Sequence, residues 1–241
     1  MTRFLLGAAM QRIGIIGGLG PESTLEYYRG IIHAFNQKNG GFDYPEIIIY
    51  SMNLGLVLDL FDAEDWDGLQ SALLHALESL HKSGAAFGAI ASNTPHIVWE
   101  RIEPASPIPL ISIVETVCLE ARRLGLKRPG LLGTSLTMRS DYYHRRLKQD
   151  GIQAVSPPQK DQALIQHYLD TEIEKGILKP QTRAELLAIV DRMRTQDGID
   201  SVVLGCTELP LILPESDYGV PFLNTTNLHV QAIVERCQND S

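Results

Sequence analysis

Two short polar stretches each follow an apolar run, and both contain residue types that can move a proton. The first is "ASNTPH", Ala91–His96, and the second is "GCTELP", Gly205–Pro210. Cys206 in the second stretch carries a thiol, whose unperturbed pKa of about 8.5 needs only a modest shift to supply a thiolate base. Ser92 in the first stretch carries a hydroxyl, which needs a neighbouring base before it can accept a proton.

The setting of Cys206 favours catalysis over packing. It lies between Gly205 and Thr207 at a predicted strand-to-helix turn, where backbone N–H groups and the positive end of a helix dipole stabilise a thiolate. We therefore expect Cys206 to be alkylated well below the pH at which a free thiol reacts. Cys118 and Cys237 lie inside helical patterns without such flanking residues, and we interpret them as packing residues.

A glycine-rich stretch, "GGLGPES" at Gly17–Ser23, follows the first predicted strand and opens a predicted helix. A dinucleotide-binding turn would also need an acidic residue at the end of the second strand. That strand ends in "YSMN", Tyr50–Asn53, and Pro21 interrupts the turn. The remaining interpretations are a structural turn and a loop that lines a site for a small anionic ligand.

The composition is that of a globular protein, with 44% hydrophobic and 21% charged residues in 241. A net charge of -8 argues against a nucleic-acid partner, and no apolar run approaches the roughly 18 residues of a membrane span. The three widely spaced cysteines form neither a disulfide framework nor a zinc pattern, which fits a reducing cytoplasm. No lysine is placed for a pyridoxal Schiff base, so we predict chemistry on a small molecule without metal or cofactor.

Apolar runs alternate with longer amphipathic segments, a pattern typical of βαβ units and parallel sheets. The predicted strands are Ile13–Ile16, Glu46–Tyr50, Ala85–Ala91, Pro109–Ile113, Pro129–Leu132, Ile152–Val155, Ser201–Leu204 and Val220–Leu223. The predicted helices are Ser23–Gln37, Trp66–Lys82, Ile113–Leu124, Ser140–Gly151, Lys160–Gly176, Gln181–Asp197 and Thr226–Arg236. The sequence therefore predicts an α/β fold.

Two segments of the chain recur in nearly one register. "GIIGG" at Gly14–Gly18 returns as "GLLGT" at Gly130–Thr134, an offset of 116, and "AIASNTP" at Ala89–Pro95 returns as "VLGCTELP" at Val203–Pro210. This agreement indicates a duplicated half.

Ser92 and Cys206 hold equivalent positions in the repeat, 114 residues apart. Ligands of open parallel sheets bind beyond the carboxyl ends of the strands. Two facing halves would therefore place Ser92 and Cys206 on opposite walls of one cleft, a geometry that suits reaction at both faces of a planar intermediate.

These motifs together resemble the aspartate/glutamate racemase family, in particular its aspartate racemase branch. Gly17–Thr24 is similar to the family's first loop, Ser92–His96 to its C-N-T-x-H, Leu131–Met138 to its L-L-G-T-x-x-T-M, Gly205–Glu208 to its G-C-T-E and Asn224–His229 to its D-T-T-x-x-H. The resemblance covers Ile13 to about Glu235. Glu208 favours the aspartate branch, because glutamate racemases usually have histidine there.

The resemblance implies a two-base racemase that works without pyridoxal phosphate and binds its substrate in a cleft between two domains. Each would be an αβα domain with a parallel four-stranded sheet, the two related by a pseudo-twofold axis. We expect the first domain to comprise residues 11–112 and 212–241, and the second residues 113–211. A homodimer in the cytoplasm is also expected, with no nucleic-acid or membrane partner.

The resemblance also implies roles for individual residues. Cys206 and Ser92 would be the catalytic pair. The residues expected to bind substrate are Leu19, Met52, Asn53, Asn93, Thr94, Thr134 and Thr207. The residues expected to support them from behind are Glu208, His96 and His229. Hydrogen-bond donors around the developing enediolate must offset the weak acidity of an amino-acid α-proton.

The sequence departs from the family at Ser92, where a second cysteine is usual. Three interpretations stay open: a racemase that favours one direction, a single-base decarboxylase or isomerase of a small dicarboxylate, and a ligand-binding relative without activity. The substrate is open as well. Phe61 and Leu164 lie where dicarboxylate-specific relatives have polar or basic side chains, although Arg139 or Lys160 could compensate.

Overall fold

The computed structural model describes residues 10–39, 42–213, 216 and 218–238, in which strands and helices alternate as predicted. The strands are β1 (Ile13–Gly17), β2 (Ile47–Ser51), β3 (Phe87–Ile90), β4 (Leu110–Ile111), β5 (Pro129–Gly133), β6 (Ser201–Gly205) and β7 (Phe222–Asn224). The α-helices are α1 (Pro21–Asn39), α2 (Leu54–Asp62), α3 (Trp66–Lys82), α4 (Trp99–Ile102), α5 (Ile113–Arg123), α6 (Ser135–Arg139), α7 (Tyr142–Gln149), α8 (Gln159–Thr171), α9 (Pro180–Arg192), α10 (Leu209–Ile212) and α11 (Thr225–Gln238). Short helical turns are η1 (Thr94–Val98), η2 (Glu103–Ala105), η3 (Ile173–Lys175) and η4 (Met193–Asp197).

The strands form two sheets in which every pairing is parallel, which confirms the predicted α/β class. The first sheet has the order β2-β1-β3-β4 and the second the order β5-β6-β7. The second sheet was predicted to have four strands, the fourth at Ile152–Val155. Only Val155 bridges to Gly130 there, because Pro157 and Pro158 follow at once and cannot donate to a sheet ladder.

Strand pairing follows the repeat found in the sequence. Ile16 of β1 pairs with Ile90 of β3, and Leu132 of β5 pairs with Leu204 of β6. These pairs keep the offsets of 116 and 114 found in the sequence motifs. Each half therefore has one parallel strand pair in the same arrangement, and a polar stretch follows the second strand of each pair.

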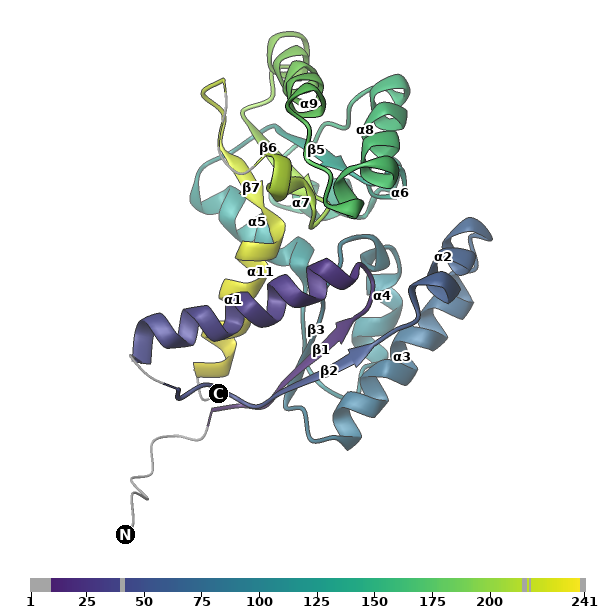
Figure 1. Cartoon of the computed structure of the whole chain (residues 1–241), viewed down its shortest axis with the longest axis vertical. Coiled ribbons are helices and arrows are strands. Elements are labelled where there is room, and N and C mark those ends of the chain that lie inside the picture. The colour runs from purple at the N-terminus through teal and green to yellow at the C-terminus, as the bar shows by residue number, and fades with distance from the viewer. Residues whose placement is uncertain (1–9, 40–41, 214–215, 217, 239–241) are drawn as a thin grey trace.

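Each sheet has a helical layer on both faces (Figure 1). In β1, Ile15 packs with α1 and α11, whereas Ile16 packs with α3 on the other face. In β5, Leu131 packs with α5 and α7, whereas Leu132 packs with α8 and α9. This alternation is the two-residue period of a strand covered on both sides.

The last part of the chain joins the two halves. We predicted residues 212–241 in the domain of the first sheet, but β7 pairs with β6 of the second sheet. Helix α11 then packs on both α1 and α5, and runs from the upper to the lower half in Figure 1. The assignment of β7 to the first domain was therefore wrong, while a boundary near residue 112 stays a prediction.

Two helices that shape the cleft were not predicted. Helix α2 has an almost continuous apolar sequence, and its start is fixed by Asn53, whose Oδ1 accepts the N–H of Gly55 at 3.0 Å. Helix α6 begins at the N-cap Thr134, whose Oγ1 accepts the N–H of Thr137 at 3.1 Å. Within the described part of the chain, no helix is long and apolar enough to cross a membrane.

Candidate active site

A cavity of about 530 Å³ lies where the central strands of both sheets end. Its wall includes most of the residues that the sequence predicted for the site: Leu19, Ser92, Asn93, Thr94, Thr134, Cys206, Thr207 and Glu208. Residues from the two halves thus line one cavity. A volume of this size is typical of small-molecule sites.

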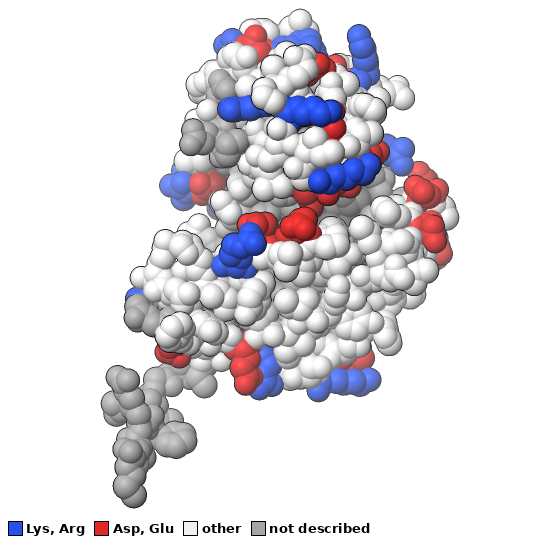
Figure 2. Space-filling view, viewed as in Figure 1, with Lys and Arg blue, Asp and Glu red and all other residues white. Residues whose placement is uncertain are grey.

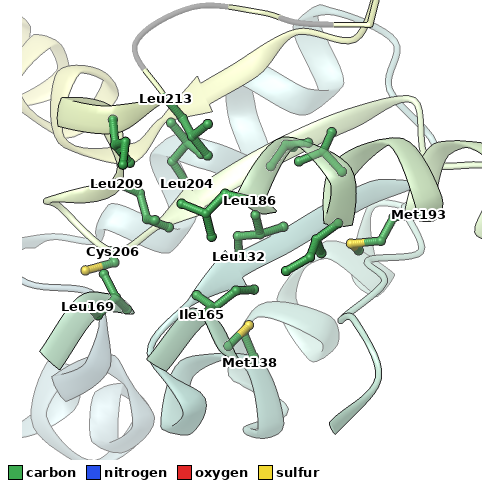
Figure 3. Close-up of a cluster of buried hydrophobic side chains, with 14 of the residues drawn as sticks. Leu132, Met138, Ile165, Leu169, Leu186, Met193, Leu204, Cys206, Leu209 and Leu213 are labelled. Carbon is green, nitrogen blue, oxygen red and sulfur yellow. The ribbon is translucent and has the colours of Figure 1, made fainter. Parts of the chain in front are cut away.

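Cys206 lies at the margin of a large hydrophobic cluster of the second half. Its side chain is 6% exposed, and Figure 3 shows it beside Leu169 with its sulfur directed away from the cluster. The Sγ donates to Oε2 of Glu208 at 3.0 Å. Burial, followed by the negative charge and the hydrogen bond of Glu208, raises the pKa of this thiol well above its usual range.

This result corrects the expectation of an activated thiolate at Cys206. The helix that follows, α10, has only four residues, and Glu208 stands between it and the sulfur. A short helix contributes little dipole, whereas a carboxylate at hydrogen-bond distance opposes thiolate formation directly. In this structure Cys206 is therefore a protonated thiol with a base beside it.

Glu208 of the second half lies against the glycine loop of the first half. Its side chain is 7% exposed, and its Oε2 also accepts the hydroxyl of Thr207 at 2.8 Å. Its Oε1 lies 2.9 Å from the point where a Cβ on Gly20 would be, and Gly20 has a φ of +116°. A side chain at residue 20 would therefore meet this carboxylate, so the glycine loop is shaped to receive Glu208.

Asn93 is held by residues of the second half. Its Nδ2 donates to Oγ1 of Thr225 at 3.1 Å, and its Oδ1 accepts the hydroxyl of Tyr143 at 2.6 Å. The hydroxyl of Tyr142 donates to the Asn93 carbonyl at 3.2 Å. Because its side chain is 2% exposed and already paired, Asn93 fixes the loop rather than presenting its amide to a ligand.

Three threonine hydroxyls form a ring beside this loop. Thr94 lies 3.2 Å from both Thr134 and Thr137, and Thr134 lies 3.0 Å from Thr137, all between Oγ1 atoms. The Tyr142 hydroxyl, which donates to the Asn93 carbonyl, also lies 3.1 Å from Oγ1 of Thr137 and can accept its hydrogen. Rotation of one hydroxyl can redirect a hydrogen to a ligand without leaving its oxygen unpaired.

Backbone N–H groups on both walls are available to a ligand. Those of Asn93, Thr94 and Thr207 have no acceptor among the residues that the structure describes, and all three residues line the cavity. Unpaired backbone donors in a cavity are suited to a carboxylate or an enediolate oxygen.

Ser92 lines the same cavity from the first half and lacks a comparable partner. Its backbone N–H donates to the carbonyl of Ile90 at 2.8 Å, but its hydroxyl has no hydrogen bond within the described ranges. No carboxylate or imidazole is bonded to it there. The sequence shows a thiol in one half and a hydroxyl in the other. The structure adds that, of these two groups, only the thiol has a carboxylate among the described residues as its hydrogen-bond partner.

Four predicted site residues lie outside this cavity. Asn53 caps α2, and the backbone of Met52 donates to the Gly17 carbonyl at 2.9 Å. His96 lines a separate cavity of about 360 Å³, and His229 is fully buried. Neither Met52 nor Asn53 lines the cavity here, and their predicted substrate contacts stay a prediction.

The two histidines lie behind the Ser92 wall as neutral side chains. His229 places Nδ1 2.7 Å from the Tyr27 hydroxyl and Nε2 2.9 Å from the Ile111 carbonyl, so Nε2 carries the hydrogen. Burial lowers the pKa of His229 to about 4. Burial, with a smaller contribution from His229, lowers the pKa of His96 to about 3.

The structure adds wall residues that sequence reasoning missed. Acidic side chains come from four different elements: Glu22 of α1, Asp62 of α2, Asp170 of α8 and Glu174 of η3. Phe61 and Arg139 line the cavity, whereas Leu164 packs against the core and Lys160 is not in the wall. Among the described residues, no group of three or more side chains is arranged to hold a metal ion.

The fold and cavity define an α/β protein with facing, duplicated strand ends, and comparisons with known proteins give its family. The sequence profile of Asp/Glu/Hydantoin racemases matches residues 16–233. The broad specificity amino-acid racemase RacX of Bacillus subtilis is 27% identical over 217 residues, which cover 89% of this chain and 92% of the relative.

Solved structures agree with this comparison. The crystal structure of an aspartate racemase homologue from Pyrococcus horikoshii is 34% identical and has a TM-score of 0.84, covering 95% of this chain and 100% of that one. The aspartate racemase of Picrophilus torridus, at 22% identity, has a TM-score of 0.74 over 94% of both chains, a likeness of fold. The chain belongs to the Asp/Glu/Hydantoin racemase family, and it is an isomerase of the racemase class.

Proposed function

We propose that this protein racemises a free amino acid in the cavity by moving the α-proton between Cys206 and the opposite wall. The observation that carries the proposal is the Cys206–Glu208 hydrogen bond of 3.0 Å at the end of β6, in a cavity that Ser92 also lines. A thiol with a buried carboxylate beside it forms an acid–base pair. Family membership supports the same reaction class.

The first half of the reaction uses Cys206 as a base. Glu208 accepts the Sγ proton, the thiolate takes the proton from Cα, and the electron pair moves onto the substrate carboxylate as an enediolate. The free backbone N–H groups of Asn93, Thr94 and Thr207 are the donors proposed for that charge. A thiolate that forms only with substrate bound agrees with the raised pKa of the resting thiol.

The second half returns a proton from the face of Ser92. The Ser92 hydroxyl gives its hydrogen to Cα, and water replaces that hydrogen while Glu208 releases its own. The opposite direction would require Ser92 to remove a proton without a base bonded to it. We therefore propose a racemase that favours one direction, in which Ser92 is an acid more readily than a base.

We also propose that the protein acts as a homodimer in the cytoplasm. The edge strand β2 exposes Ile49 and the adjacent α2 exposes Leu56, both apolar. Three buried free cysteines are compatible with a reducing compartment. Light scattering of the purified protein tests the dimer, and a single-chain mass would contradict it.

Proton exchange in D2O tests the proposed reaction. Each enantiomer of a panel of acidic, basic and neutral amino acids is incubated with the enzyme, and loss of the α-proton is followed by NMR with chirality measured in parallel. We expect both enantiomers of a substrate to exchange, with faster inversion in one direction. Absence of exchange in every amino acid would overturn the racemase proposal.

A further inference from the structure

The cavity wall carries many more negative than positive side chains. Its carboxylates belong to Glu22, Asp62, Asp170, Glu174 and Glu208, and its single cationic side chain is Arg139. Within the described residues none of these five carboxylates forms an ion pair. Figure 2 shows acidic side chains at the groove between the two halves, with Lys or Arg side chains of the outer surface beside them.

Arg139 already forms an ion pair with another residue. Its Nη2 lies 3.5 Å from Oε1 of Glu64, a residue that follows α2 in the first half. This pair bridges the two halves at the surface, and both side chains are more than half exposed. Arg139 therefore does not neutralise the five wall carboxylates.

The acidic groups also act on one another. The pKa of Glu174 is raised by burial and then by the charges of Glu208 and Asp170. Gln166 donates its Nε2 to Asp170 at 2.6 Å, a neutral contact that brings no positive charge. Lys175 acts on Glu174 in the opposite direction, but among the described residues no cationic side chain forms an ion pair with these wall carboxylates.

We propose that the substrate of this cleft is an amino acid with a positively charged side chain, such as lysine, ornithine or arginine. This inference rests on the proposed racemase function and names its substrate class. The α-ammonium of any amino acid can neutralise one carboxylate, and Glu208 beside Cys206 lies at that end of the site. Four carboxylates remain for the side chain, those of Glu22, Asp62, Asp170 and Glu174.

The rest of the wall fits a long basic side chain. Leu58 and Phe61 of α2 line the cavity and offer apolar contact to methylene groups. A second carboxylate, as in aspartate, would instead meet several uncompensated negative charges in a partly enclosed site. The same lining that attracts a basic amino acid therefore disfavours an acidic one.

A substrate panel tests the inference directly. The ratio kcat/KM is measured by D2O exchange for L-lysine, L-norleucine and L-aspartate, together with their D-enantiomers. Norleucine has the same chain length as lysine without the ammonium. We expect lysine to exceed norleucine by about tenfold or more and aspartate by a larger factor, with the first ratio falling as salt rises from about 0.05 to 0.5 M.

Single charge removals identify the carboxylates that act. Asp62→Asn, Asp170→Asn and Glu174→Gln should each lower the lysine-to-norleucine ratio by about threefold to tenfold. Asp59→Asn is the matched control, since Asp59 lies exposed on the same helix as Asp62 and outside the cavity wall. It should leave the ratio unchanged.

The outcomes separate the inference from the proposed function. Exchange of aspartate or glutamate faster than lysine would overturn the cationic substrate while supporting a racemase. Equal rates for lysine and norleucine would overturn it as well. If no amino acid exchanges, the racemase proposal and the inference both fail; if Asp59→Asn lowers the ratio as much as Asp62→Asn does, the assignment to the cavity wall is wrong.

Discussion

The two cleft walls that hold Ser92 and Cys206 have the same backbone arrangement, but different side chains surround the two residues. Ile90 and Leu204 occupy matching positions in their sheets, and the proton-handling residue follows two positions later in each half. The Cys206 wall adds a carboxylate at 3.0 Å, whereas the Ser92 hydroxyl has no hydrogen bond among the described residues. The two halves thus share a backbone arrangement, while the side chains around Ser92 and Cys206 differ.

The two walls also differ in how they are held. The Ser92 loop is fixed by neutral hydrogen bonds, chiefly from Tyr143 and Thr225 to Asn93, with neutral histidines behind it. The Cys206 wall is fixed by the charge of Glu208 against the glycine loop. One wall is therefore held by neutral hydrogen bonds, and the other by contacts to a carboxylate that we propose also accepts a proton.

The largest effect is expected from Cys206→Ala. Removing the thiol takes away the proposed base, so α-proton exchange should fall by about 1000-fold or more for both enantiomers. The assay is D2O exchange at saturating substrate, with circular dichroism to verify the fold. Retention of full exchange would mean that the Ser92 wall, or another group, removes the proton.

Acidification should lower the stability of the fold through the two buried histidines behind the Ser92 wall. The pKa of His229 is about 4 in the folded protein against an ordinary 6.5, so the unfolded chain binds the proton first as pH falls. The free energy of unfolding should therefore decrease between pH 6.5 and 4, by about 3 kcal/mol from His229 and further from His96. Urea unfolding measured across this range checks it, and a constant or rising stability on acidification would contradict burial of neutral histidines.

Glu208→Gln should remove the carboxylate that distinguishes the Cys206 wall from the Ser92 wall. Loss of the proton acceptor should lower kcat by about 100-fold. It should also lower the pKa of Cys206, because a negative charge and an accepted hydrogen bond are removed, and so speed iodoacetamide alkylation at pH 8. Glu78→Gln, on the surface of α3, is the control; slower alkylation of the Glu208 variant would show that the carboxylate activates the thiol.

The smallest effect is expected from Ser92→Cys, which restores matching proton-handling groups on both walls. A thiol ionises more readily than a hydroxyl, so inversion in the slower direction should rise by about tenfold. The ratio of the two initial inversion rates measures this change. Ser92→Ala is the companion variant: it should allow one enantiomer to exchange without inverting, and equal inversion by it would exclude Ser92 as the second proton carrier.

Local patterns were sufficient for most of the fold. The β1 and β3 strands, their repeats β5 and β6, and the polar stretches after them follow from apolar runs and strand-end residues close together in the chain. Helix α2 was missed, because it is short and largely apolar, and the role of Asn53 as its N-cap was missed with it. A residue type that serves both capping and binding does not by itself indicate the cap.

The sequence by itself determined the family, the α/β class and the matching strand ends that carry Ser92 and Cys206, since each depends on short-range pattern or repeat offset. Only the tertiary structure decided the protonation of Cys206, because that depends on burial and on the side-chain direction of Glu208. It alone also assembled the acidic wall from α1, α2, α8 and η3. Those side chains are far apart in the chain and share no motif. Their negative charges act together only because folding brings α1, α2, α8 and η3 around one cavity.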